Sequence, residues 1–395
     1  MSKRPIYFLL NDDYSGVSII VTYIVMFLNK DLFDVTIIMH HQVDVDKKIE
    51  RHPNIMAGLP VIKIFYSKYE NLYSVARRLA KLAKFDNKET FLFTNDSHSL
   101  ALLALLKVQN PIAFMLHGDM NYYYSTALKF QNNINLYFTY SNKVYTKLKS
   151  LLPGQLNNIH KVYYPYPHSN FKRFKNTNKR LRVLYAGRLD NGHKGIFDLP
   201  KIDQMLKQNG VLVKWHIIGF GRDEDELKER WNSAENVEWI GKVDNKNVLK
   251  LCSANDLIVL PSRVEGLPVV LVEAMKVGLI PLVTDIDSGY PDVITDGENG
   301  FILPVGDIKA FSDKITLLHV NREKLEEMSI NSLNSITLMF NPQKNINEFE
   351  RLINGLPYNN FSKKPYIKIG SKLDSKYLPN FLVKAIRKVI GKIIS

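Results

Sequence analysis

Two glutamates, Glu265 and Glu273, stand eight positions apart in the stretch RVEGLPVVLVEAMKVG. Pro268 suits the first turn of a helix, where its missing N–H is not needed, so we expect a helix to begin at about Leu267. Glu265 then lies in the loop before this helix, and Glu273 lies about two turns along it. Both carboxylates can therefore face one crevice, separated by roughly the length of a sugar plus a ribose.

The first turn of this predicted helix lies between the two carboxylates. Its free N–H groups form an anion site, for which a diphosphate is the natural occupant. Carboxylates accept pairs of hydrogen bonds from vicinal diols, which phosphates do not offer. One glutamate can thus hold a hexose and the other a ribose, with the diphosphate between them. The pattern predicts a site for a nucleotide-sugar.

Two basic residues upstream supply the positive charge that a departing diphosphate needs. Arg188 follows the apolar run LRVLYA, and Lys194 stands six residues further on. Arginine can bind two phosphate oxygens in a fork, and lysine adds a point charge. With both present we expect no metal ion and no other cofactor, and the sequence contains no Cys/His cluster with metal-ligand spacing.

The elements that must position these residues read as two series of short apolar runs that alternate with helix-like stretches. Such alternation predicts βα units around parallel sheets, and ligands of these sheets bind in the loops at the carboxyl ends of the strands. The first series is IYFLL, DVTIIM, FLFT, IAFMLH and LYFTYS, and the second is LRVLYAG, VKWHIIG, VEWIG, LIVLPS, IPLVTD and GFILPV.

The length of 395 residues, with 45% hydrophobic residues, fits two α/β domains. We expect a Rossmann-like acceptor-side domain over residues 1–172 and a donor-binding domain over 180–340, with the boundary in the polar stretch HSNFKRFKNTNKRLR. A helix over 341–358 is expected to pack back across the domains, and residues 359–395 form a basic amphipathic tail.

Four stretches resemble the donor domain of a family 4 glycosyltransferase of the GT-B fold: GRLDNGHKG, IIGFGRDEDEL, PSRVEGLPVVLVEAM and TDIDSGYPDVITDGENGFILPVGD. The resemblance is strong over about 180–305 and looser in the first half. It implies two Rossmann-like domains that face each other across a cleft, and a transferase that retains anomeric configuration. The family's usual account is front-face attack, in which the departing phosphate helps to remove the acceptor's proton, so we nominate no protein nucleophile.

The resemblance also implies a role for each candidate residue. Arg188 and Lys194 would bind the diphosphate. Glu265 would hold the transferred sugar, Glu273 the ribose hydroxyls, and His117 matches the family's active-site histidine near the sugar. Further donor contacts are implied for loop glycines and for backbone beside the ligand, namely Gly16, Gly187, Gly219, Lys242, Val243, Gly266, Leu267, Pro268 and Val269.

The net charge of +14 is concentrated near the C-terminus, where residues 359–395 carry nine Lys and Arg against one Asp. Leu382, Ile386, Val389 and Ile393 form one stripe at helical spacing, with basic residues on the flanks. Such a helix suits an anionic membrane surface, and the alternative is that it covers a protein core with an ordinary basic rim. We expect no nucleic-acid partner, because aromatic residues are not interleaved with the basic ones.

The run VSIIVTYIVMFL, about a dozen residues long, predicts a buried helix and not a membrane span. The apolar run at the N-terminus is too short for a signal peptide. We therefore expect a cytoplasmic protein, peripheral at the inner face of the cytoplasmic membrane.

These observations predict transfer of a hexose or N-acetylhexosamine from a nucleotide diphosphate sugar, with a UDP-sugar favoured, to a hydroxyl of a growing cell-envelope glycan or lipid-linked glycan. One alternative is a nucleotide-sugar epimerase, which would need an additional base within the sugar pocket, and the sequence shows no clear candidate for it beyond His117 and Asp119. The other is a catalytically silent partner that binds sugar nucleotides. Such a partner would be expected to have lost a phosphate ligand or a glutamate, and the sequence has lost neither.

Overall fold

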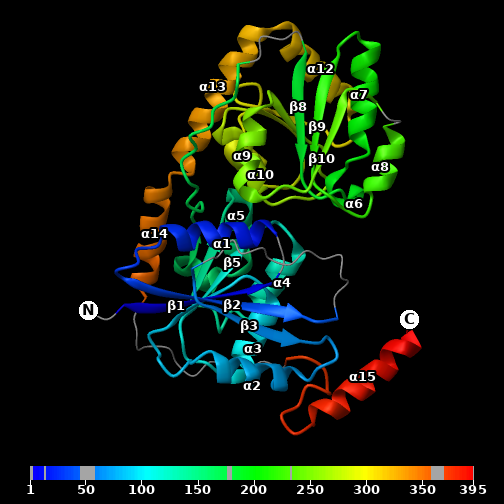
Figure 1. The fold of residues 1–395 in the computed structure, drawn as a ribbon. Coiled ribbons are helices and arrows are strands. Elements are labelled where there is room, and N and C mark those ends of the chain that lie inside the picture. The colour runs from blue at the N-terminus through cyan, green and yellow to red at the C-terminus, as the bar shows by residue number, and fades with distance from the viewer. Residues whose placement is uncertain are drawn as a thin grey trace. The chain divides into compact units, whose positions relative to one another are not determined.

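A computed structural model describes residues 3–12, 15–44, 58–175, 180–231, 234–356 and 369–394, with the side chains of 245–246 and 391–394 excepted. The chain forms two compact α/β units (Figure 1). The first unit contains Met1–Tyr140, Val144–Pro165 and Pro342–Ser395, and the second contains Ser141–Lys143 and Tyr166–Asn341. The first unit is thus built from both ends of the chain.

Within the described residues, the first unit holds a seven-stranded parallel sheet in the order β3-β2-β1-β4-β5-β6-β7. Five of these strands coincide with predicted apolar runs, and β3 and β7 were not predicted. The strands are β1 (Arg4–Asn11), β2 (Phe33–Gln42), β3 (Val61–Tyr66), β4 (Phe91–Thr94), β5 (Ile112–Leu116), β6 (Leu136–Thr139) and β7 (Ile159–Lys161).

Helices and one 3₁₀ turn connect and cover these strands. The apolar run near the N-terminus forms α1, a largely buried helix as predicted. The side chain of Asn71 caps α2 and that of Asp96 caps α3, each by accepting a bond from a first-turn N–H. The helical elements are α1 (Gly16–Phe27), α2 (Leu72–Leu82), α3 (Ser97–Leu106), α4 (Asn121–Lys129), α5 (Asn142–Leu151), the 3₁₀ turn Pro153–Asn158, α14 (Pro342–Asn354) and α15 (Asn380–Ile394).

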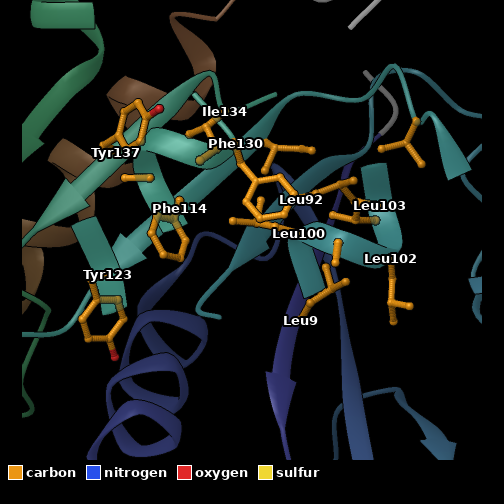
Figure 2. Packing of buried hydrophobic residues seen from close by; sticks show 14 of the residues in the cluster. Leu9, Leu92, Leu100, Leu102, Leu103, Phe114, Tyr123, Phe130, Ile134 and Tyr137 are labelled. Atoms are coloured by element: carbon orange, nitrogen blue, oxygen red, sulfur yellow. The ribbon is translucent and has the colours of Figure 1, made fainter. Parts of the chain in front are cut away.

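The core of the first unit lies between the sheet and helices α2, α3 and α4 (Figure 2). Leu9, Leu92 and Phe114 enter it from three neighbouring strands, and all are fully buried. Burial of a side chain of this size contributes roughly 1.5–3 kcal/mol relative to exposure. Ile369, which precedes α15, belongs to the same cluster at 6% exposure. The C-terminal segment is therefore held by the core of the first unit.

In the described part of the second unit, six parallel strands follow the order β10-β9-β8-β11-β12-β13, and all six coincide with predicted runs. They are β8 (Leu181–Ala186), β9 (Val213–Ile218), β10 (Val237–Gly241), β11 (Leu257–Leu260), β12 (Ile280–Thr284) and β13 (Phe301–Leu303). The helices are α6 (Asn191–Lys194), α7 (Asp198–Gln208), α8 (Glu224–Arg230), α9 (Asn245–Ser253), α10 (Val269–Lys276), α11 (Tyr290–Val293), α12 (Ile308–Val320) and α13 (Arg322–Met339). The α/β fold class is confirmed.

The chain enters the second unit at Tyr166, whereas the sequence analysis set the boundary between residues 172 and 180. The physical reason is that the segment after Tyr166 already bonds to the second unit. The N–H of Arg173 donates to the carbonyl of Val277 (2.6 Å), and the N–H of Phe174 donates to that of Ser253 (2.9 Å).

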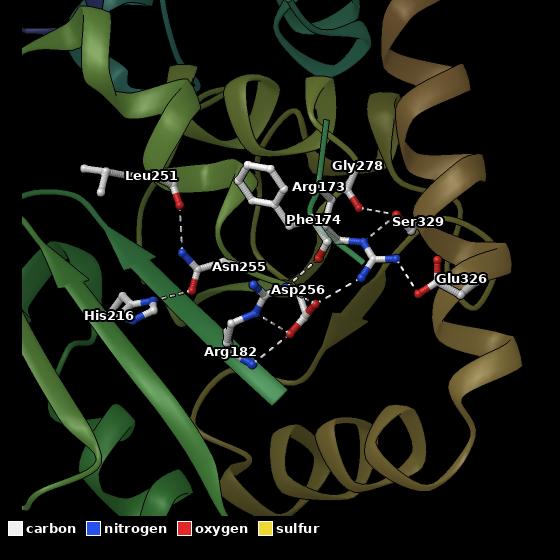
Figure 3. A network of polar contacts seen from close by, with 10 residues as sticks. All are labelled: Arg173, Phe174, Arg182, His216, Leu251, Asn255, Asp256, Gly278, Glu326 and Ser329. Carbon is white, nitrogen blue, oxygen red and sulfur yellow. Dashed lines mark hydrogen bonds and ion pairs between the residues drawn. The ribbon is translucent and has the colours of Figure 1, made fainter. Parts of the chain in front are cut away.

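Asp256, just before β11, is the centre of a buried ionic network in this region (Figure 3). Its carboxylate accepts bonds from Arg173 (3.0 Å) and from the guanidinium and backbone N–H of Arg182 (2.9–3.1 Å). Arg173 also donates to Ser329 and pairs with Glu326, both on α13. The network fastens the entering segment, the sheet and α13 together at the amino end of the strands.

The C-terminal helix α15 bonds to residues before and at the start of α2, within the first unit. Lys384 pairs with Glu70 (3.0 Å), and Arg387 pairs with Asp374 (2.6 Å), which itself accepts the N–H of Leu72. Val383 is fully buried. Two basic residues of the helix therefore face protein carboxylates.

The predicted apolar stripe of the tail needs correction. Leu382 and Val389 are exposed at 40% and 59%, and the buried contact is made by Val383. Ile386 is half-buried, and the side chain of Ile393 lies outside the described residues. The ion pairs of Lys384 and Arg387 turn the helix so that Phe381, at 76% exposure, and Val389 face solvent. None of the helices in the described ranges combines the length and apolarity needed to span a membrane.

Candidate active site

The predicted donor residues gather where the order of the second sheet reverses. Strands β8 and β11 are neighbours at this point, although β9 and β10 lie between them in the chain. Arg188 and Lys194 follow β8, and Glu265 follows β11. Since the strands are parallel, these loops leave the same edge of the sheet, which is where ligands of such sheets bind.

Lys194 and Glu265 are in direct contact. The Lys194 ammonium lies 2.5 Å from Glu265 Oε1, which also accepts a bond from the Ser262 hydroxyl (2.9 Å). The two charged side chains are 19% and 10% exposed. A cation and a carboxylate from loops 71 positions apart therefore share one partly buried spot.

The short helix α6 fixes the position of Lys194. Asp190 caps its start by accepting the N–H of His193 (3.2 Å). Gly195 ends it with a φ of 61°, and a Cβ atom at Gly195 would lie 2.1 Å from the carbonyl oxygen of Pro261. Only glycine satisfies both conditions, because a side chain would clash and the left-handed conformation would be strained. The sequence Lys194-Gly195 thus lets the two loops meet.

Arg188 lies in the same loop and is exposed. The hydroxyl of the buried Tyr185 donates to its carbonyl (2.8 Å), so the backbone is fixed while the side chain extends. Among the residues that the structure describes, the Arg188 guanidinium has no ion-pair partner, so its fork of donors is open to an anion.

The loops after β8 and β9 pass unusually close to each other. Gly219 has a φ of 133°, and a Cβ atom there would lie 1.8 Å from the carbonyl oxygen of Gly187. The N–H of Gly219 donates to the carbonyl of Gly241 (2.8 Å), the residue before Lys242 and Val243. The predicted donor contacts Gly219, Lys242 and Val243 therefore share this sheet edge with the predicted phosphate ligands.

Helix α10 begins two residues later than the predicted start at Leu267. Pro268 has extended backbone (ψ 133°) and occupies the N-cap, so Gly266, Leu267 and Pro268 remain in the loop and Val269 is the first helical residue. The carbonyl of Gly266 accepts the N–H of Gly289 (2.8 Å). The first-turn N–H groups of α10 lack helical partners by geometry and are suited to an anion.

Glu273 lies in a different environment from Glu265. It is 3% exposed, and burial raises the pKa of its carboxyl to about 8. Its Oε1 accepts a long bond of 3.4 Å from the hydroxyl of Tyr166. The two glutamates, expected to act in the same way on one crevice, thus differ: Glu265 is an ion-paired carboxylate, and Glu273 is a buried acid that is mostly protonated at neutral pH.

Two predicted site residues lie in the first unit. Gly16 is the first residue of α1, whose start is closed by reciprocal bonds between Ser15 and Ser18. His117 directly follows β5, and its Nε2 lies 2.7 Å from the side-chain oxygen of Asn95. Burial lowers the pKa of His117 to about 3, so the ring is neutral at physiological pH.

Sequence reasoning missed four residues that hold these side chains in place: Asn95, Tyr166, Tyr185 and Ser262. Asn95 and Ser262 could have been noticed, since each is a polar residue in a loop that follows an apolar strand. Tyr166 acts on Glu273 across 107 positions, a distance that no local pattern encodes, whereas Tyr185 is a buried strand residue that bonds a carbonyl three positions away. In the described ranges, no group of three or more His, Cys, Asp or Glu side chains is arranged to hold a metal ion.

Known proteins resemble this chain in sequence and in structure. Residues 168–334 match the family described as "Glycosyl transferases group 1". The structure matches that of Alr3699/HepE from Anabaena, crystallised with UDP and glucose, with a TM-score of 0.73 over 90% of this chain and 100% of the other at 14% identity. The matched segment is thus similar to glycosyltransferases, and the chain as a whole has the GT-B fold.

The chain has sequence relatives whose names refer to a polysaccharide or to an undecaprenol-linked glycan. It is 28% identical over 173 residues to a putative colanic acid biosynthesis glycosyltransferase, WcaL, of Salmonella typhimurium, which is 41% of this chain and 42% of that one. A second relative is the Campylobacter jejuni enzyme named GalNAc-alpha-(1->4)-GalNAc-alpha-(1->3)-diNAcBac-PP-undecaprenol alpha-1,4-N-acetyl-D-galactosaminyltransferase. It is 24% identical over 76% of this chain and 84% of its own length. The chain spans about two fifths of the length of the first relative.

Proposed function

We propose that this protein transfers a hexose or N-acetylhexosamine from a nucleotide diphosphate sugar to a hydroxyl group, with retention of anomeric configuration. The observation that carries the proposal is the contact of Lys194 with Glu265 beside the exposed Arg188, at the reversal point of the second sheet. Such a donor requires cations for its diphosphate and a carboxylate for its sugar hydroxyls, close together in one place.

In the proposed mechanism, the diphosphate leaves while Arg188 and Lys194 neutralise the charge that grows on it. Glu265 orients the sugar through its hydroxyls, and Glu273 holds the ribose. The departing phosphate helps to remove the acceptor's proton, so no side chain has to act as a nucleophile. The two basic side chains supply the positive charge that a metal ion would otherwise supply, and we expect the reaction to need neither metal nor cofactor.

We favour UDP as the nucleotide and a cell-envelope glycan or lipid-linked glycan as the acceptor. The UDP proposal is supported by the Anabaena protein, whose structure contains UDP and glucose. The acceptor proposal is supported by the names of the relatives, which include colanic acid biosynthesis and an undecaprenol-linked glycan.

Binding of a donor should raise the thermal stability of the protein. A ligand present at about 100 times its Kd stabilises the folded state by about 2.7 kcal/mol. We expect one of UDP-glucose, UDP-N-acetylglucosamine, GDP-mannose and dTDP-glucose to raise the melting temperature, and Lys194→Ala to reduce the rise. Differential scanning fluorimetry measures it, with slow hydrolysis of the same donor as a second readout.

The matched control for this panel is Lys309→Ala. Lys309 forms an exposed i,i+4 pair with Asp313 on α12, so its loss should leave the nucleotide response unchanged. If no donor in the panel shifts the native protein, the proposed activity loses its support.

We further propose that the protein is cytoplasmic and attaches peripherally to the inner face of the membrane through α15. Phe381 and Val389 are exposed at 76% and 59%, and the basic Lys388 is exposed on the same helix. Apolar side chains with adjacent lysines suit the boundary between acyl chains and anionic headgroups.

The membrane proposal predicts that vesicles containing anionic phosphatidylglycerol retain the protein at low salt, and that Phe381→Ser with Val389→Ser reduces retention at least severalfold. Val320→Ser with Leu338→Ser is the matched control, because these residues are exposed at 76% and 75% on α12 and α13. Co-sedimentation measures the bound fraction. Equal retention of the two double variants would contradict the role of α15.

A further inference from the structure

Near both ends of its long segment in the second unit, the chain contacts helix α10. It enters the second unit at Tyr166 and leaves it after Asn341, the residue that follows Phe340. Both Tyr166 and Phe340 bond to side chains of α10, the helix that carries Glu273. Glu273, the proposed ribose ligand, is therefore bonded to the first residue of this segment, and Lys276 of the same helix is bonded to its second-last residue.

The first tie is the hydrogen bond from the Tyr166 hydroxyl to Oε1 of Glu273, at 3.4 Å. Tyr166 is 1% exposed and Glu273 is 3% exposed, so water has little access to this bond. A hydrogen bond to a buried carboxyl restricts its rotamer and favours its charged form. The rotamer and the charge of the carboxyl both affect how well it accepts hydrogen bonds from ribose hydroxyls.

The second tie uses Lys276, one helical turn beyond Glu273. Its ammonium donates to the carbonyl of Phe340 (3.2 Å), at the end of α13, where a cation also meets the negative end of the helix dipole. The same ammonium lies 5.7 Å from the centre of the Tyr166 ring. The Lys276 ammonium thus contacts the face of the Tyr166 ring, while the Tyr166 hydroxyl contacts Glu273.

We propose that Tyr166 is a positioning residue of the donor site: it holds the Glu273 carboxyl in the orientation that accepts the ribose hydroxyls, and Lys276 holds Tyr166. The inference rests on the proposed function, which supplies the ribose. Tyr166 lies outside every motif of the donor domain and 107 positions before Glu273.

Among the described residues, Tyr166 donates to the Glu273 carboxyl and the buried thiol of Cys252 on α9 interacts with it electrostatically, while Lys276 lies one turn further along the same helix. Burial raises the pKa of Glu273 to about 8 and lowers that of Lys276 to about 8, and it keeps the pKa of the thiol well above its usual range. Glu273 and Lys276 therefore change charge within the same window of pH.

The expected pH dependence follows from which form of Glu273 binds. Ribose hydroxyls donate, so the carboxylate is the better partner, and the Kd for the donor should fall as the pH rises through about 8. The hydroxyl of Tyr166 lowers the pKa of Glu273 by stabilising the carboxylate. Its removal should raise that pKa further and move the binding profile to higher pH.

The test measures donor Kd from pH 6 to 9.5 by isothermal titration calorimetry, with the four nucleotide-sugars used for the thermal panel as probes. Tyr166→Phe should bind about threefold to tenfold more weakly at pH 7, with its profile displaced to higher pH. Glu273→Gln should show no slope near pH 8, because an amide does not titrate. Tyr137→Phe is the matched control, since Tyr137 is fully buried and its hydroxyl has no hydrogen-bond partner among the described residues.

The outcomes separate the inference from the function beneath it. If the native protein binds a donor and Tyr166→Phe matches it at every pH, the positioning role is wrong and the proposed function stands. A slope that persists in Glu273→Gln assigns the titration to Lys276 and also overturns the inference. If the native protein binds none of the probes, the proposed function fails and the positioning role fails with it.

Discussion

Replacement of Lys194 by alanine is expected to lower kcat by on the order of 10²- to 10³-fold, the effect of removing one preorganised group that stabilises charge in a transition state. The ammonium lies 2.5 Å from Glu265 and is only 19% exposed, so water replaces it poorly. The substitution also leaves the Glu265 carboxylate with the Ser262 hydroxyl as a remaining donor. Initial rates of transfer or donor hydrolysis, at saturating donor, measure the loss.

Two comparisons make this prediction specific. Lys309→Ala removes an exposed lysine of the same unit and should keep kcat unchanged. Thermal melting of the Lys194→Ala variant without ligand shows whether the fold persists. A variant that melts like the native protein and turns over at the native rate would mean that Lys194 does not act on the leaving group.

Replacement of Asp256 by alanine is expected to lower the free energy of unfolding by about 3–5 kcal/mol, because removal of one partner leaves buried charge uncompensated. Asp256 is fully buried, and its carboxylate accepts bonds from Arg173 and Arg182. The side chain of Arg173 is itself only 5% exposed, so water cannot take the place of the lost carboxylate. Urea denaturation followed by circular dichroism measures the change.

The control for this loss is Asp313→Ala, which breaks an exposed ion pair of α12 and should cost no more than about 0.5 kcal/mol. Asp256 lies at the amino end of β11, and the predicted donor residues lie beyond the carboxyl ends of the strands. Donor affinity should therefore stay close to native below the unfolding transition. Equal stabilities of the two variants would mean that the network contributes nothing to the fold.

The strands of the second unit could be predicted because buried parallel strands are nearly continuous apolar runs. LIVL, which forms β11, has this character throughout, and LRVLYA, which forms β8, is interrupted only by Arg182. β3 was missed because it lies at the edge of its sheet with Val61 and Phe65 exposed, and β7 because it has only three residues. Edge strands of this kind take their conformation from a neighbour.

The meeting of candidate residues from separate loops was also predictable, and their finer contacts were not. Residues that follow neighbouring parallel strands must emerge at one edge, which brought Lys194 and Glu265 together. The partner of Glu273 is Tyr166, far away in the chain, and no local pattern points to it. In α15, helical spacing predicted an apolar stripe, but the carboxylates of Glu70 and Asp374 decided which face turns inward.

The discontinuous make-up of the first unit bears on how the protein is synthesised. Phe349 of α14 stacks on Phe138 at 4.7 Å, the guanidinium of Arg4 donates to the carbonyl of Ile353, and Ile369 completes the core. The strands of the first unit, which are translated early, therefore lack part of their core until the residues after Asn341 have been translated. The second unit, nearly continuous from Tyr166 to Asn341, is fully translated earlier. During translation the nascent chain can therefore complete its second unit first, while the seven strands at its N-terminus depend longest on chaperones for protection from aggregation.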